Sequence, residues 1–371
     1  MNLETIQTPA LVLDIERVKR NADRIGARVR DLGARLRPHV KTHKCIEVAR
    51  IQTAGHSGAL TVSTLAEARA FVAGGFREIT YAVPIEPGKF KATTDLARVC
   101  DLSLITDDPQ IPQHLNEAAK RAEIVLKLFL KVDCGYHRCG VEPDSEEAIA
   151  IPVQISAASN LRFAGILTHA GHSYHYRDPH ERLTIARHER DVMAELAEKL
   201  GMKGIEVPTV SIGSTPTVTI VDHLNGVDEV RPGNYIFFDA FQAAIGSCGI
   251  EDCALTVLAA VVHRDLKRNK LVIDAGAIAL SKDRGAVEFD PTCGYGRVLD
   301  IEGADLGLNV TSLSQEHGEI LSQNCDIDRL KVGTRVRVLA NHSCLSAAQH
   351  SYYNILERNQ IVDRWKIQGG W

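Results

Sequence analysis

The stretch Ile124-Val125-Leu126-Lys127-Leu128-Phe129-Leu130-Lys131-Val132-Asp133 is the clearest indication of the fold. It is a mostly apolar run that ends in a charged residue, as expected for a buried strand. Residues 110–122 come just before it and have apolar side chains at helical spacing. A helical segment followed directly by a buried strand predicts an alternating β/α architecture.

The same alternation recurs along much of the chain. Strand-like apolar runs lie at residues 36–40, 59–63, 78–83, 101–106, 124–133, 163–169, 209–213 and 228–231. Segments with helical spacing separate them, for example at residues 65–74 and 181–201. Eight such units predict a (β/α)8 barrel. A doubly wound sheet is the structural alternative, but no GxGxxG motif follows an early strand.

The pattern changes after Tyr235. Short β-like runs at residues 255–262, 270–274 and 334–340 are separated by Gly, Asp and Asn, which predicts a second, smaller β-rich domain. An isolated strand pattern at residues 10–14 comes before the barrel units. Because no low-complexity linker separates the two regions, we expect them to pack together and share a site.

The composition excludes several classes of protein. The chain has 371 residues, of which 44% are hydrophobic, enough for two globular cores. A net charge of -4, with basic residues spread among acidic ones, argues against a nucleic-acid partner. The first residues do not resemble a signal peptide, and the longest apolar run, 254–262, is too short to span a bilayer. We therefore expect a cytoplasmic protein with no membrane partner, whose nine cysteines are reduced.

Polar residues cluster where predicted strands end, which is where the active-site loops of a barrel converge. Lys41 follows the first barrel strand between His39 and His43, residues 133–140 follow the fifth strand, and residues 168–174 follow the sixth. Each could be an ordinary polar loop, but three at equivalent positions favour a functional site. Partial burial beside cationic groups would help Lys41 lose its proton, which makes it the candidate Schiff-base lysine.

Small residues follow the seventh strand. Residues 211–217 combine hydroxyl groups with a proline suited to a first helical turn, and residues 231–235 end the eighth strand. Barrels often bind phosphate with these two loops, although an ordinary helix cap is the alternative. A phosphate-binding cup opposite Lys41, with His169 and Arg138 between them, is the arrangement that pyridoxal phosphate requires.

A separate signal, Asn341-His342-Ser343-Cys344, follows the strand-like run 332–340. Residues i and i+2 of a strand point to the same face, so His342 and Cys344 could bind one metal ion. Nitrogen and sulfur ligands favour zinc. Two ligands do not complete a site, and a buried cysteine beside a loop histidine is the alternative. An open coordination sphere would suit a catalytic metal that binds a substrate hydroxyl.

In combination these motifs resemble the D-serine dehydratase and D-threonine aldolase family of fold-type III pyridoxal phosphate enzymes, which are relatives of alanine racemase. The matching motifs are residues 37–44, 132–140, 169–174, 213–217, 231–239 and 341–344. The resemblance implies a cofactor-binding barrel over residues 1–235, whose first strand joins a β-rich domain over residues 236–371. It also implies a homodimer.

The resemblance also implies a role for each matching residue. Lys41 would bind the cofactor covalently, Arg138 would lie near its phenolic oxygen, and His169 would stack on its ring. The other expected cofactor contacts are Tyr174, Gly213, Ser214, Thr215, Gly233, Asn234 and Tyr235. His342 and Cys344 resemble the family's metal pair, for which zinc is expected and manganese is the alternative.

The activity implied is the elimination of water from a small-molecule β-hydroxy D-amino acid such as D-serine or D-3-hydroxyaspartate, which yields a keto acid and ammonia. Retro-aldol cleavage to glycine and an aldehyde is the alternative, although the aldolase branch typically has His-x-Asp where this chain has His342 and Cys344. A racemase would need a second base and no metal. A non-catalytic pyridoxal phosphate carrier would lack the residues after Tyr235.

Overall fold

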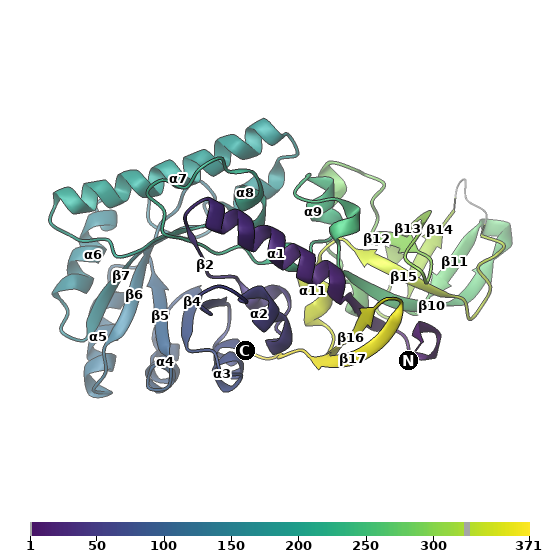
Figure 1. The fold of residues 1–371 in the computed structure, drawn as a ribbon, viewed down its shortest axis with the longest axis horizontal. Helices are drawn as coiled ribbons and strands as arrows, with labels where there is room; N and C mark the ends of the chain where they lie inside the picture. Colours follow the sequence, from purple (N-terminus) through teal and green to yellow (C-terminus); the bar gives the residue numbers. More distant parts are fainter. Residues whose placement is uncertain (1, 323–326) are drawn as a thin grey trace. The chain divides into compact units, whose positions relative to one another are not determined.

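The computed structural model describes residues 2–322 and 327–371 and divides the chain into two compact units (Figure 1). We call the first the sheet unit, which comprises Met1–Asp23, Thr42–Val48 and Asn234–Gly369. The second is the barrel unit, which comprises Arg24–Lys41, Ala49–Gly233 and Gly370–Trp371. Each unit is described by itself.

Eight parallel strands form the sheet of the barrel unit, in the order β2-β9-β8-β7-β6-β5-β4-β3. Their bounds are β2 Arg35–Leu36, β3 Leu60–Val62, β4 Glu78–Pro84, β5 Asp101–Thr106, β6 Leu126–Lys131, β7 Leu161–Leu167, β8 Val210–Ile212 and β9 Glu229–Val230. A parallel bridge between His39 and Thr61 joins the two ends of this order. The arrangement confirms the predicted (β/α)8 barrel.

Helices alternate with these strands along the chain. They are α3 Leu65–Ala73, α4 Phe90–Ala97, α5 Ile111–Arg121, α6 Glu147–Ala157, α7 Pro179–Met202 and α8 Thr215–Ile220. Local sequence explains where they form. Helix α7 begins after Asp178, whose side chain accepts the His180 N–H at 2.7 Å, and Pro179 occupies its first position. Two further helices, α1 Ile15–Asp31 and α2 Ile46–Gln52, contain residues of both units.

All eight predicted barrel strands overlap an observed strand, but the first was predicted too long. We expected it over residues 36–40, whereas β2 ends at Leu36 and a 3-10 turn occupies Val40–Thr42. Pro38 has no N–H to donate to a strand ladder, which shortens the regular pairing. Lys41 therefore lies in a tight turn beyond the strand.

Nine strands form the sheet of the sheet unit, in the order β11-β14-β13-β12-β15-β10-β1-β16-β17. Their bounds are β1 Ala10–Asp14, β10 Leu255–Asp265, β11 Lys270–Ile273, β12 Gly296–Leu299, β13 Asp305–Leu313, β14 Gly318–Leu321, β15 Arg335–Ala340, β16 Tyr352–Glu357 and β17 Gln360–Lys366. The long β10 also pairs with β11, which closes part of the sheet into an antiparallel barrel. The predicted β-rich domain is thereby confirmed.

The first strand of the chain lies inside this sheet. It pairs antiparallel with β10 and parallel with β16. Leu11 and Leu13 are fully buried, and Val12 packs in a core cluster that includes Ile6 and Leu258. The sheet unit also carries the short helices α9 Ala240–Ala244, α10 Ala277–Leu280 and α11 Ser343–Ala348. Among the described residues, no helix is both long and apolar enough to cross a membrane.

Candidate functional site

The side chain of His39 contacts the turn that contains Lys41. The Lys41 N–H lies 3.4 Å from His39 Nδ1, and His39 Nε2 lies 3.4 Å from Ser63 Oγ. The expectation that Lys41 would be partly buried is wrong, because the turn leaves its side chain exposed. The second flanking histidine, His43, belongs to the sheet unit and is buried there. Its carbonyl accepts the Tyr353 hydroxyl at 2.7 Å.

His169 follows β7 in the barrel unit. Its Nδ1 lies 3.1 Å from the Gly213 carbonyl oxygen, which can only accept, so Nδ1 carries the proton. Burial, reinforced by the positive charges of Lys41 and Arg138, holds the pKa of His169 well below its ordinary value. The structure thereby brings Lys41 and Arg138 within electrostatic reach of His169. A neutral, fixed imidazole suits stacking on a cofactor ring.

Arg138 lies in the loop that follows β6. Its exposed guanidinium lies over the Tyr136 ring, 5.0 Å from the centroid, and Tyr136 in turn meets His169 edge-on at 6.1 Å. Asp133 stabilises this loop, because its Oδ1 accepts the backbone N–H groups of Gly135 and Tyr136, both at 2.9 Å. Arg138 is therefore presented on an ordered loop beside His169.

Asp133 also belongs to a cluster that could hold a metal. Ligand atoms of Asp133, His137 and Glu142 lie within 4.8 Å of one another. However, His137 and Glu142 are exposed, and the Asp133 carboxylate already accepts the N–H groups of its own loop. We assign the cluster the role of anchoring the loop that carries Arg138.

The predicted phosphate cup is built from buried backbone. Gly213 has a φ of +117°, and a Cβ there would lie 3.0 Å from the Arg231 backbone nitrogen, so this position requires glycine. Ser214 caps α8 through a capping box with Thr217, which is the helix cap that was the alternative interpretation of this loop. Ser214 Oγ also lies 3.1 Å from Ser173 Oγ, which links the cup to the loop after β7.

The remaining predicted cofactor contacts are divided between the two units. Tyr174 is part of a 3-10 turn at Gly171–His175 and is partly buried. Thr215 and Gly233 are buried in the barrel unit. Asn234 and Tyr235 follow Gly233 directly and are buried in the sheet unit. The buried, glycine-dependent turn and the neutral His169 fit a flat phosphorylated cofactor such as pyridoxal phosphate.

Sequence reasoning missed Glu189, which connects two of these loops. Its Oε1 accepts the Ala170 N–H at 2.9 Å and the Gly213 N–H at 3.1 Å. The side chain is fully buried, and burial raises the pKa of this carboxyl. A signal was present: Glu189 falls between Ala186 and Met193 on the buried face of α7, where an acid is unusual.

His342 and Cys344 come together in the sheet unit, but not for the predicted reason. Strand β15 ends at Ala340, so the two residues do not share a strand face. His342 instead precedes α11 and Cys344 lies in its first turn, where the two side chains interact electrostatically. Although burial opposes both shifts, their interaction lowers the pKa of Cys344, and with Asp283 it raises the pKa of His342 to about 11. An imidazole beside a thiol whose pKa is lowered fits a zinc-type donor set.

The Cys344 side chain contacts one predicted site residue and a neighbour of another. Its Sγ lies 3.4 Å from Thr42 Oγ1 and 3.5 Å from Asn234 Nδ2. Thr42 follows Lys41 in the chain. Asp239, which sequence reasoning also missed, accepts the Asn234 Nδ2–H at 2.7 Å and the Ser343 N–H at 3.0 Å. The Asp239 carboxylate thus connects Asn234 to the start of α11.

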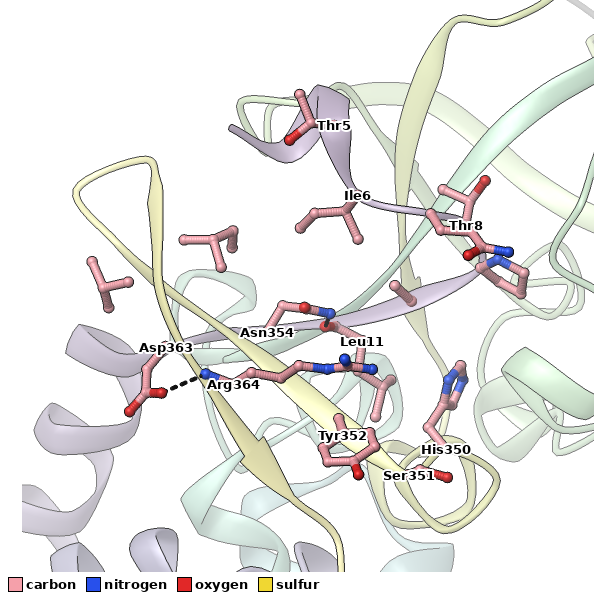
Figure 2. A pocket seen from close by; sticks show the side chains of 15 residues that line it. Thr5, Ile6, Thr8, Leu11, His350, Ser351, Tyr352, Asn354, Asp363 and Arg364 are labelled. Atoms are coloured by element: carbon pink, nitrogen blue, oxygen red, sulfur yellow. Dashed lines mark hydrogen bonds between the residues drawn. The ribbon is translucent and has the colours of Figure 1, made fainter. Parts of the chain in front are cut away.

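The sheet unit also contains a pocket of about 720 Å³ between the N-terminal segment and the β16–β17 hairpin (Figure 2). Arg364 lies across the Tyr352 ring, 4.1 Å from its centroid. His350, also on the wall, has Nε2 3.2 Å from the Ala279 carbonyl oxygen. None of the predicted site residues lines this pocket.

Comparison with known proteins agrees with this architecture. Residues 13–240 match the alanine racemase N-terminal domain, and residues 254–356 match the serine dehydratase domain. The chain is 38% identical to D-threo-3-hydroxyaspartate dehydratase from Delftia sp. (strain HT23), covering 100% of this chain and 99% of that protein. It is 34% identical to D-serine dehydratase from Dictyostelium discoideum, covering 100% and 98%.

A solved structure is similarly close. A variant of D-threo-3-hydroxyaspartate dehydratase in which a cysteine is replaced by alanine, in its metal-free form, superimposes with a TM-score of 0.96 at 38% identity and covers 100% of both chains. The match therefore includes both units and runs the full length of the two proteins. As its motifs indicated, the chain belongs to the D-serine dehydratase and D-threonine aldolase family of fold-type III pyridoxal phosphate enzymes.

Proposed function

We propose that this protein is a pyridoxal phosphate- and metal-dependent lyase that eliminates water from a β-hydroxy D-amino acid, with D-3-hydroxyaspartate and D-serine as the leading substrates. The relatives of 38% and 34% identity, which are dehydratases for these compounds, support the substrate class. The observation that carries the choice of elimination is that Cys344, and not an aspartate, pairs with His342. Elimination leaves an enamine, which hydrolyses to the keto acid and ammonia.

The barrel unit supplies the residues that handle the cofactor and the proton. When bound, pyridoxal phosphate supplies an electron sink for the charge left at Cα. Lys41 would hold the cofactor through its side-chain amine, and the same amine, when free, would accept the Cα proton. His169 would pack a neutral ring against the cofactor, and the buried turn at Gly213 and Ser214 would hold the phosphate. Arg138 would supply a positive charge near the phenolic oxygen.

His342 and Cys344 hold a divalent metal in this proposal, zinc being the expected ion and manganese the alternative. When bound, the metal supplies a Lewis acid for the departing β-hydroxyl, which is otherwise a poor leaving group. Support comes from the electrostatic interaction between the His342 imidazole and the Cys344 thiol, which lowers the pKa of that thiol. It also comes from the metal-free form described for a cysteine-to-alanine variant of the related dehydratase.

Product analysis with and without metal tests the proposal. D-serine or D-3-hydroxyaspartate should yield keto acid and ammonia without glycine, and L-enantiomers should be inert. Chelator treatment should abolish turnover while the visible absorption of the bound cofactor persists, and added zinc should restore turnover. Glycine and an aldehyde as products would establish the aldolase alternative. Full activity of metal-free protein would remove the metal from the mechanism.

We also propose that the enzyme is a homodimer, on the basis of its family. Multi-angle light scattering of the cofactor-loaded protein should give twice the chain mass of 40.6 kDa. A mass equal to one chain would contradict this assignment.

A further inference from the structure

We propose that Asp283 is a positioning residue of the metal site: its carboxylate fixes the ring of His342 so that Nε2 is presented to the metal. The proposal deepens the function proposed above, because it takes His342 as a metal ligand. Asp283 Oδ2 lies 2.6 Å from His342 Nδ1. An acidic oxygen at this distance selects the tautomer with the proton on Nδ1 and leaves Nε2 as the ligand atom.

The Asp283 carboxylate is itself held in place. Its Oδ1 accepts the Gly285 N–H at 2.7 Å, so the two carboxylate oxygens serve different partners. The Asp283 carbonyl accepts the Asn341 Nδ2–H at 3.2 Å, and Asn341 is the residue before His342. Two hydrogen bonds therefore connect the segment around Asp283 to the start of α11. A side chain restrained in this way can orient a ring, whereas a freely rotating surface acid cannot.

The chemistry of histidine ligands explains why such a partner matters. Histidines that bind metals usually donate the other ring N–H to a carboxylate, which fixes the ring and makes the ligand nitrogen more basic. Removal of this partner typically weakens metal binding by about 10- to 100-fold. Asp283 does not act as a ligand in this proposal, because Oδ2 is committed to His342 and Oδ1 to Gly285.

Metal affinity of the full-length, cofactor-loaded protein tests the inference directly. The wild-type protein and the Asp283→Ala variant are stripped of metal, and zinc affinity is measured by competition with a chromophoric chelator. We expect the alanine variant to bind zinc about 10- to 100-fold more weakly. Asp283→Asn keeps an oxygen that can accept from Nδ1 and should recover much of this loss. Cobalt substitution adds a spectroscopic readout, since a reoriented ring changes the visible spectrum of the bound ion.

A matched control uses another aspartate of the same unit. Asp305 pairs with Arg297 at 3.1 Å and touches neither His342 nor Cys344 in the described contacts, so Asp305→Ala should bind zinc like the wild type. The role of Asp283 would be overturned if Asp283→Ala kept wild-type zinc affinity and an unchanged cobalt spectrum while His342→Ala bound zinc weakly. That result would leave the proposed metal pair intact. Equal zinc binding by the wild type and His342→Ala would instead refute the proposed metal pair. Should Asp283→Ala not fold, the same comparison is made with Asp283→Ser, whose shorter side chain cannot reach His342 Nδ1 as the carboxylate does. Weaker zinc binding than in the wild type is then expected, and wild-type affinity with an unchanged cobalt spectrum would overturn the role of Asp283.

Discussion

Lys41 and Lys44 are three positions apart, yet they occupy different surroundings. Lys41 lies in a turn of the barrel unit, and its charge acts on His169. Lys44 belongs to the sheet unit, where it adopts a φ of +49° and its carbonyl accepts the Gln368 N–H at 2.6 Å. Only Lys41 is therefore associated with the residues that are expected to surround the cofactor.

We predict that Lys41→Ala loses the visible absorption of covalently bound pyridoxal phosphate, because it removes the only amine expected to bind the aldehyde. Turnover should fall by at least about 100-fold, since the same amine acts as the base. Lys44→Ala is the matched control and should keep the absorption band. Spectra of the two purified proteins after incubation with the cofactor provide the measurement. A band that persists in Lys41→Ala, or disappears only in Lys44→Ala, would identify a different lysine.

Helix α7 has a function beyond covering the barrel. The carboxylate of its buried Glu189 accepts one backbone N–H from the loop after β7 and one from the loop after β8. These loops carry His169 and the Gly213 turn, which are also linked directly by their own hydrogen bond of 3.1 Å. The helix thus sets the spacing between the residue expected to stack on the cofactor and the turn expected to bind its phosphate.

Replacement of Glu189 should disturb both loops together. Glu189→Ala leaves two buried N–H groups without their acceptor, which should lower the free energy of unfolding by about 2–4 kcal/mol and weaken cofactor binding. Glu189→Gln retains an acceptor oxygen and should bind the cofactor nearly as well as the wild type. Urea denaturation and titration with pyridoxal phosphate measure the two effects. Glu198→Ala, an exposed position on the same helix, is the control. Wild-type cofactor affinity in Glu189→Ala would show that the loops keep their geometry without it.

At the scale of the whole molecule, the N-terminal strand belongs to the sheet built by the C-terminal residues. Strand β1 lies between β10 and β16, and Leu13 pairs in register with Leu255 and Ile355. Leu13 is fully buried. The sheet unit therefore cannot complete its sheet until the first and last parts of the chain have both been made.

We predict that Leu13→Ala destabilises the sheet unit selectively. The loss of a fully buried leucine should lower the free energy of unfolding by about 2–5 kcal/mol. Hydrogen exchange should increase in β10 and β16 more than in the barrel strands β5 and β6. Val262→Ala serves as control, because Val262 lies on β10 but is 42% exposed. Equal loss of protection in β5 and β6 would contradict a separate response of the sheet unit.

Much of the architecture was predictable from local sequence. The eight barrel strands were recognised because a buried strand is a short apolar run. The cap of α8 was considered only as the alternative for residues 211–217, since Ser214 and Pro216 act on the residues next to them. The pairing of His342 with Cys344 was also anticipated, although through the wrong element. Residues i and i+2 within a helix do not face each other, so the pairing depends on His342 lying just before α11 with an extended backbone.

Contacts between distant segments were decided by tertiary structure alone. Asp283 reaches His342 from 59 positions away, and Glu189 joins loops that begin at Ala170 and Gly213, so no local pattern could indicate either contact. The exposure of Lys41 likewise depends on the path of the chain beyond Pro38. Periodicity and capping act over a few residues and can be read from the sequence, whereas a side chain's partners across the fold are set only when strand order and packing bring distant segments together.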